Sequence, residues 1–152
     1  MSPSDPDIDF FRLPRTVDRK SIGQFAAELR TRVARGRAFG CRVTTDAELR
    51  RLNRTFRRKD AATDVLSFPA SLPGGPADTY LGDVAISWQR ARAQAREFGH
   101  SIETEIRVLM LHGVLHLRGM DHETDGGRMS RSETRWRRAF GLPAGLIERV
   151  NA

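Results

Sequence analysis

The sequence predicts an α+β fold, a single compact domain over residues 1–152 in which a small mixed β-sheet of about four strands packs with about five helices. The chain length allows one ordinary domain with a substantial core but leaves little room for a second. Apolar stretches with strand character alternate with segments of helical periodicity in the order strand, helix, strand, helix, strand, strand, then helices. One late segment is apolar on nearly every side, which predicts a central buried helix.

The first part of the chain predicts two strands that flank one helix. A short apolar stretch at residues 8–13 predicts the first strand. Between residues 21 and 36 the apolar side chains recur every three or four positions, so they share one face of a helix that Arg35 and Gly36 end. Residues 38–44 predict the second strand.

A second helix is predicted to begin directly after residue 44. Thr45 and Glu48 have the spacing of a capping box, in which each side chain binds a free backbone N–H of the first turn. The helical spacing then directs three apolar side chains toward the core, namely Leu49, Leu52 and Phe56.

The middle of the chain predicts two more strands and a third helix. Val65, Leu66 and Phe68 indicate a short strand, and a loop rich in proline and glycine follows it. Residues 80–87 alternate as a strand does, and residues 88–98 have helical character with Gly99 as the stop.

The central buried helix is predicted to run from a cap at Ser101 to Gly119. A last, amphipathic helix follows at residues 127–140. Its inward candidates are Met129, Trp136 and Phe140.

Composition points to a soluble protein with a polyanionic partner. The formal charge is +7, and arginine supplies nearly all of the positive charge. Because a guanidinium binds phosphate in two-point contacts, this bias favours nucleic acid. An arginine-rich genome would also explain it, so charge alone leaves both interpretations open.

Nothing in the sequence directs the protein to a membrane or to export. No apolar run approaches the roughly 20 residues of a membrane span. The N-terminus lacks the basic start and apolar stretch of a secretory signal. Cys41 is the only cysteine and leaves no internal disulfide possible, so we expect a cytoplasmic protein.

The candidate chemistry lies in the segment HGVLHLRGMDHETD, at the end of the predicted buried helix. His112 and His116 are four residues apart and stack on one face of a helix. Gly119 permits the chain to turn and to carry His122 back toward them. Three imidazoles are a familiar set of zinc ligands that leaves a fourth position for water, so the sequence predicts one catalytic zinc ion per chain.

The same segment argues against a peptidase. Helical metalloproteases place a glutamate directly after the first histidine as the general base, whereas Gly113 stands here. A base must come from elsewhere, and Asp121 and Glu123 are candidates that would equally serve to orient the imidazoles. His100 lies outside the spacing, and we expect it to be structural.

Three stretches resemble the YbeY family of metal-dependent endoribonucleases. The pattern His-Gly-x-Leu-His-Leu-x-Gly-x-Asp-His is present in full from His112 to His122. LNRTFRRKDAATDVLSFP (52–69) and LGDVAIS (81–87) are similar to two further family stretches, so the resemblance covers about residues 45–125. Met120 stands where the family usually has an aromatic residue or histidine, a change expected to affect packing but no ligand.

The resemblance implies zinc-dependent hydrolysis of single-stranded RNA, in the maturation of the 16S ribosomal RNA 3′ end and in ribosome quality control. It also implies contact with ribosomal RNA and the small ribosomal subunit. It further implies a functional arginine at Arg57, which could hold a phosphate oxygen and offset charge in the transition state. From composition alone, Arg57 and its neighbours Arg50, Arg54 and Arg58 would instead form a solvated helical face.

Two other functions stay open at the level of sequence. In the first, the protein is a non-catalytic ribosome assembly factor that binds RNA and uses a structural metal, which a fourth protein ligand would indicate. In the second it hydrolyses another substrate, which a narrow cavity without a basic approach would indicate.

Overall fold

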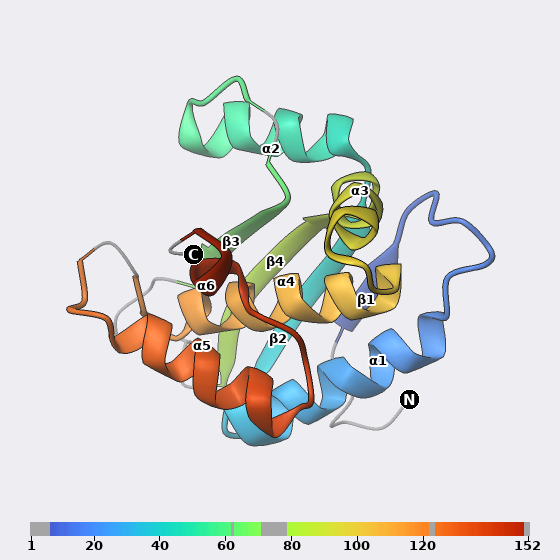
Figure 1. Cartoon of the computed structure of the whole chain (residues 1–152). Helices are drawn as coiled ribbons and strands as arrows, with labels where there is room; N and C mark the ends of the chain where they lie inside the picture. Colours follow the sequence, from blue (N-terminus) through green and yellow to red (C-terminus); the bar gives the residue numbers. More distant parts are fainter. Residues whose placement is uncertain (1–6, 62, 71–78, 122–123, 151–152) are drawn as a thin grey trace.

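The computed structural model describes residues 7–61, 63–70, 79–121 and 124–150, and its centre is a mixed four-stranded sheet in the order β1-β2-β4-β3 (Figure 1). β1 (Asp7–Phe10), β2 (Ala38–Thr44) and β4 (Tyr80–Ser87) are parallel, whereas β3 (Val65–Pro69) pairs antiparallel with β4. Parallel neighbours need a crossover, and the chain supplies one between each parallel pair. The predicted α+β class is confirmed.

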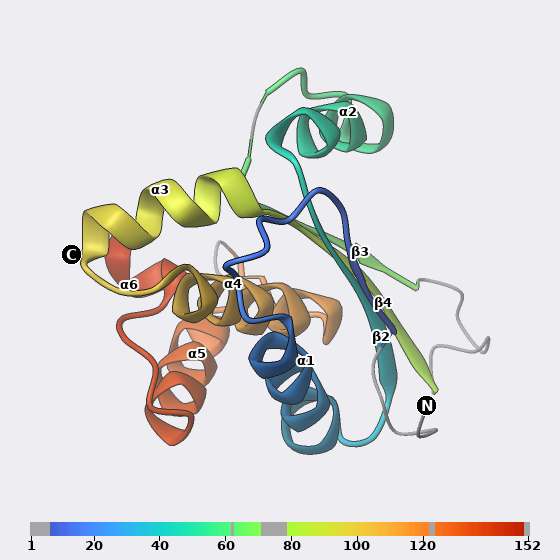
Figure 2. The same ribbon diagram turned by 90° about the vertical axis from the view of Figure 1, so that its right-hand side faces the viewer.

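Helices cover the two faces of the sheet unequally. α1 (Arg19–Glu28), the π-helical turn η1 (Leu29–Val33) and α4 (Ile102–Leu117) lie on one face, whereas α2 (Asp46–Arg57) lies over the other (Figure 2). Side chains along β4 point alternately to the two faces of the sheet. Val84 and Ile86 join the main core, and Ala85 packs in the smaller cluster under α2.

Three more helices complete the layer around α4, and their bounds are α3 (Trp88–Phe98), α5 (Arg128–Ala139) and α6 (Leu146–Val150). The structure adds α6 to the helices expected from sequence. No helix in the described ranges is both long and apolar enough to cross a membrane.

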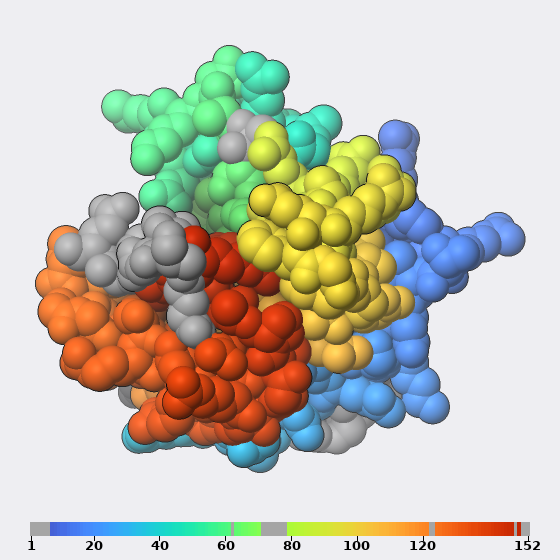
Figure 3. Space-filling model, in the orientation of Figure 1, coloured from blue at the N-terminus to red at the C-terminus, as the bar shows by residue number. Residues whose placement is uncertain are grey.

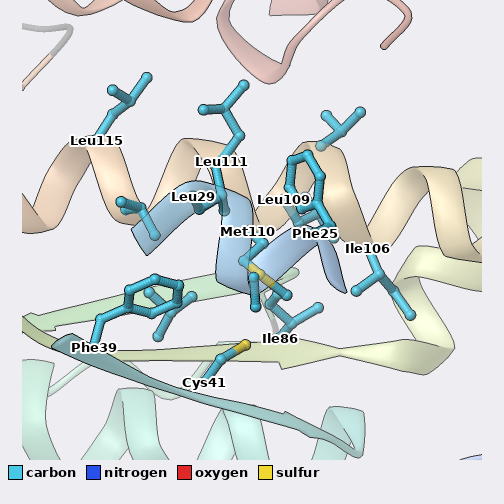
Figure 4. Packing of buried hydrophobic residues seen from close by; sticks show 14 of the residues in the cluster. Phe25, Leu29, Phe39, Cys41, Ile86, Ile106, Leu109, Met110, Leu111 and Leu115 are labelled. Carbon is cyan, nitrogen blue, oxygen red and sulfur yellow. The ribbon is translucent and has the colours of Figure 1, made fainter. Parts of the chain in front are cut away.

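The predicted buried helix is α4, which runs through the middle of the main core. Its N-terminus is capped by Ser101, whose side chain accepts a hydrogen bond from the Thr104 N–H. Leu109, Met110 and Leu111 are at most 1% exposed, and Figure 4 shows them above strand residues that include Phe39 and Ile86. Burial on all sides fixes the position of the C-terminal end of α4, where the histidines lie.

Two details of the sequence prediction are wrong. Phe56 was expected to face inward but is 65% exposed, because α2 covers only the small cluster of Leu49, Leu66 and Ala85 and Phe56 lies at its edge beside Phe68. The first strand was expected to reach residue 13 but ends at Phe10, because Arg12 adopts a φ of 55° and turns the chain.

Candidate active site

The last two turns of α4 bring His112 and His116 side by side. Their ring centroids are 4.9 Å apart and their planes are inclined by 72°. His112 is buried and His116 is half-buried, so one ring anchors the pair while the other reaches toward the surface. The spacing of four residues therefore places both imidazoles on one face of α4, as the sequence predicted.

A buried carboxylate holds His112 in position. Oε2 of Glu133, in α5, lies 2.7 Å from Nδ1 of His112, and Oε1 of the same side chain accepts a 2.9 Å hydrogen bond from the N–H of Ile147. Glu133 is 1% exposed. A carboxylate oxygen accepts the hydrogen bond of a ring N–H, so this contact favours the tautomer with the proton on Nδ1 and the lone pair on Nε2. A histidine that binds a metal through Nε2 requires this tautomer.

Both histidines open into a cavity of about 340 Å³. Arg57, from the last turn of α2, lines the same cavity, as does Asp121 from the segment after α4. The remaining lining residues are Val65, Ser67 and Pro69 of β3. The structure thus brings together Arg57 and two of the three predicted ligands, although Arg57 and His112 are far apart in sequence.

Local backbone geometry fixes Arg57 at this edge. α2 begins at the Thr45 cap, which accepts a hydrogen bond from the Glu48 N–H, and it ends at Arg58, whose φ of 57° is left-handed. The buried side chain of Asn53 donates a 3.0 Å hydrogen bond to the carbonyl of Ala61 and so ties the following loop to the helix. Arg57 is therefore the last helical residue before a fixed turn.

Close packing explains the glycine between the histidines. The hydroxyl of Ser67 donates a 2.9 Å hydrogen bond to the carbonyl of Gly113, which holds α4 directly against the sheet. A Cβ at Gly113 would lie 2.7 Å from a methyl carbon of Val84. A glutamate at this position, as in helical metalloproteases, would not fit against β4.

The described residues do not complete a metal site, since within residues 7–61, 63–70, 79–121 and 124–150 no three His, Cys, Asp or Glu side chains are placed to hold an ion. The predicted third ligand, His122, and the candidate Glu123 lie outside the described residues. Gly119 does leave the helix with a φ of +88°, as the sequence indicated. Two imidazoles, one of them oriented by a carboxylate, fit zinc chemistry.

Two further sequence expectations concern neighbouring side chains. His100 has a structural contact, because its Nε2 lies 2.7 Å from the buried carboxylate of Glu105 near the start of α4. Met120 is buried in the main core, so its departure from the family pattern is accommodated by packing.

Sequence reasoning missed Glu133, although a signal for it exists. Met129, Glu133 and Trp136 follow one another at intervals of four and three residues, so the glutamate falls on the inward face of α5. A carboxylate among inward apolar residues requires a buried partner. That partner is His112.

The sequence of this chain is similar to a known protein family and to individual proteins that carry its name. The sequence model of the family described as Endoribonuclease YbeY matches residues 15–140, more than the stretch of about 45–125 that carried the resemblance. The chain belongs to the YbeY family. An Endoribonuclease YbeY of Solibacter usitatus is 60% identical over 151 residues, which is 99% of both chains. One from Koribacter versatilis is 55% identical over 71% of this chain and 68% of its own.

A solved structure agrees with the fold. The solution structure of TM1509 from Thermotoga maritima has a TM-score of 0.59 and 26% identity, and the match covers 88% of this chain and 89% of that one. The YbeY family is one of endoribonucleases, so the enzyme class expected from the sequence is supported.

Proposed function

We propose that this protein is a zinc-dependent endoribonuclease that hydrolyses phosphodiester bonds of single-stranded RNA. The observation that carries the proposal is the cavity shared by His112, His116 and Arg57. It combines two metal-ligating imidazoles with a cation suited to phosphate in a space of about 340 Å³. The names of the YbeY relatives supply the substrate class.

His112, His116 and His122 are the proposed ligands of one zinc ion per chain. Bound zinc would supply a Lewis acid for the phosphoryl group and would activate a water molecule. The protein's own contribution begins with Glu133, which orients the ring of His112 and favours the proton on Nδ1. Six per cent exposure of His112 keeps that ring largely away from water, which strengthens electrostatic contacts there.

Arg57 is proposed to bind a non-bridging oxygen of the scissile phosphate and to stabilise negative charge in the transition state. Among the described residues it forms no ion pair, whereas its helix neighbours Arg50 and Arg54 both approach Asp60. The guanidinium of Arg57 is therefore available to a ligand. Asp121 is the carboxylate among the described lining residues, and we propose it as proton acceptor.

The biological setting is proposed from the family resemblance. We propose that the protein acts in the cytoplasm on ribosomal RNA, in maturation of the 16S 3′ end and in quality control of the small ribosomal subunit. An RNA-binding assembly factor with a structural metal is the competing function. It predicts RNA binding without cleavage.

The test combines metal analysis with RNA cleavage. Purified protein should contain about one zinc per chain by elemental analysis, and a His112→Ala, His116→Ala double variant should lose it. The protein should cut a single-stranded RNA but not a duplex, lose this activity with a chelator, and regain it with added zinc. Retention of stoichiometric zinc by the double variant would place the metal elsewhere. Full zinc occupancy without any RNA cleavage would favour the assembly factor.

A further inference from the structure

Guanidinium groups gather at the C-terminal end of α4. Arg118 caps this end, and the positive charges of Arg35, Arg37, Arg128 and Arg135 lie near enough to act on its guanidinium. Its Nε atom is buried and has no hydrogen-bond partner in the described part of the chain. Five arginines from three segments thus converge on one place.

The positive surface continues along α5. Arg131, Arg135 and Arg138 are exposed and line a shallow depression of about 440 Å³ together with Ser130 and Thr134. Arg135 belongs to this depression and also to the group around Arg118. The two groups therefore form one surface, here named the α5 basic track, whose members are Arg35, Arg37, Arg118, Arg128, Arg131, Arg135 and Arg138.

Figure 3 shows α5, in orange, on the surface at the lower left, with the blue segment around η1 along its lower edge. The contact between these segments is fixed, because the guanidinium of Arg32 in η1 lies 4.8 Å from the ring centroid of Phe140, at the end of α5. The arginines after η1 and those of α5 therefore keep their relative positions.

The described part of the chain gives the track no acidic partner. No ion pair links any of its arginines to a carboxylate within the described residues, whereas Arg42, Arg50, Arg90 and Arg149 all have one elsewhere in the fold. Clustered positive charges that are not paired with carboxylates create a positive potential, which attracts a polyanion and is relieved by it.

We infer that the α5 basic track binds the phosphodiester backbone of the RNA strand whose scissile bond occupies the His112–His116 cavity. His116 and Arg118 are two residues apart at the end of α4, so they lie on nearly opposite sides of the helix, about 200° apart around its axis. A strand that passes around this end therefore contacts the cavity on one side and the track on the other. The phosphates of a nucleic-acid backbone are regularly spaced and match a row of guanidiniums. The carboxylates of an acidic protein are scattered and match such a row less well. This inference rests on the proposed function for the identity of the strand.

The test measures how binding of a single strand depends on salt. The probe is a fluorescein-labelled single-stranded DNA of 16 nucleotides, which has the same phosphates and is not an RNA substrate. Fluorescence anisotropy from 50 to 200 mM salt is recorded for the wild type and for the triple variant Arg131→Gln, Arg135→Gln, Arg138→Gln. Because each single-strand phosphate contact adds about 0.7 to the slope of log K against log salt, losing three should lower the slope by about 2.

The matched control is Arg90→Gln, Arg92→Gln, Arg96→Gln on α3, which removes the same charge from a helix on the other side of α4 (Figure 1). The control should change the slope by less than half as much as the track variant does. Lysine in place of glutamine at residues 131, 135 and 138 should restore the wild-type slope. Equal losses in both triple variants would overturn the inference, since net charge alone would then explain binding. Poly-glutamate is added as a competitor of the labelled strand. If it displaces the strand as well as unlabelled single-stranded DNA does at equal total charge, the assignment to a nucleic-acid backbone is overturned.

Cleavage of a 16-nucleotide RNA is measured in parallel. A wild type that cuts no RNA, while only the track variant loses binding, would support the track and contradict the proposed cleavage. A wild type that cuts RNA, with a track variant that binds the strand as the wild type does, would overturn the track alone.

Discussion

Glu133 and His112 are 21 residues apart in sequence, yet Oε2 of one lies 2.7 Å from Nδ1 of the other in the interior of the protein. The second oxygen of Glu133 is occupied by the N–H of Ile147, in α6. One carboxylate therefore joins the candidate ligand to the C-terminal part of the chain. Glu133 is a positioning residue in this arrangement, and it acts through His112.

Replacement of Glu133 by Gln should separate these two contacts. A glutamine side chain has a single acceptor oxygen, so one of the two donors, His112 or Ile147, would face an NH₂ group. We expect zinc affinity to fall about 10- to 100-fold and the free energy of unfolding to fall by about 1–3 kcal/mol. Zinc affinity is measured by competition with a chromogenic chelator, and unfolding by urea.

The control for this variant is Glu97→Gln, an exposed position on α3. It should leave both quantities unchanged. Wild-type zinc affinity in the Glu133→Gln variant would show that the contact to His112 does not orient the ligand.

Gly113→Ala tests the close approach of α4 to the sheet. The new Cβ would lie 2.7 Å and 3.1 Å from the two methyl carbons of Val84, inside a packed core. We expect the free energy of unfolding to fall by about 1–3 kcal/mol. Gly23→Ala, in α1, is the matched control, because nothing lies within 4 Å of its Cβ and alanine favours a helix by roughly 1 kcal/mol. If both variants gain stability, the packing argument for Gly113 fails.

Cys41 provides a test in the alkaline range. Burial, and then the charge of Asp83, raises the pKa of the Cys41 thiol to about 12 in the folded protein, against an ordinary value of 9.0. Above about pH 9 the unfolded chain loses this proton first, so the free energy of unfolding should fall as pH rises. Between pH 8 and pH 10 the expected loss from this thiol is on the order of 1 kcal/mol.

Urea unfolding at the two pH values checks this expectation, with Cys41→Ala as the reference that lacks the thiol. The variant should lose less stability over this range than the wild type. In the folded wild type, Cys41 should also resist alkylation at pH 8, because little thiolate forms. Rapid alkylation would show that the site opens to solvent.

The sequence predicted those features that depend on local patterns. Each strand and the five longer helices follow from alternation, helical spacing and the caps at Thr45 and Ser101. The pairing of His112 with His116 follows from helix geometry, and the match of Arg57 to a family stretch pointed to the cavity that it lines.

Features that depend on tertiary packing were not predictable in this way. Phe56 has inward spacing, but α2 covers only part of its sheet face, which periodicity does not encode. Glu133 required knowledge that α5 packs beside His112. The arginines of the α5 basic track lie in three separate segments, so their convergence on Arg118 depends on the fold.

Arg57 and Arg54 provide the sharpest test of the proposed catalysis, because they are three residues apart on α2 and both exposed. Only Arg57 lines the cavity, whereas Arg54 lies 3.9 Å from Asp60. If Arg57 contacts the phosphate as charge develops, Arg57→Ala should lower the cleavage rate at saturating RNA about a hundredfold. Zinc content and thermal stability should barely change, since Arg57 is exposed and contacts neither histidine in any described interaction.

Arg54→Ala is the matched control and should weaken RNA binding only modestly, with a smaller dependence on salt. Arg57→Lys refines the test, because lysine keeps the charge but loses the two-point contact of a guanidinium, so its rate should fall between those of the wild type and Arg57→Ala. Single-turnover cleavage at saturating RNA separates the chemical step from binding. Wild-type rates for both alanine variants under these conditions would remove Arg57 from the proposed mechanism, while loss of zinc from Arg57→Ala would assign it a structural role at the metal site.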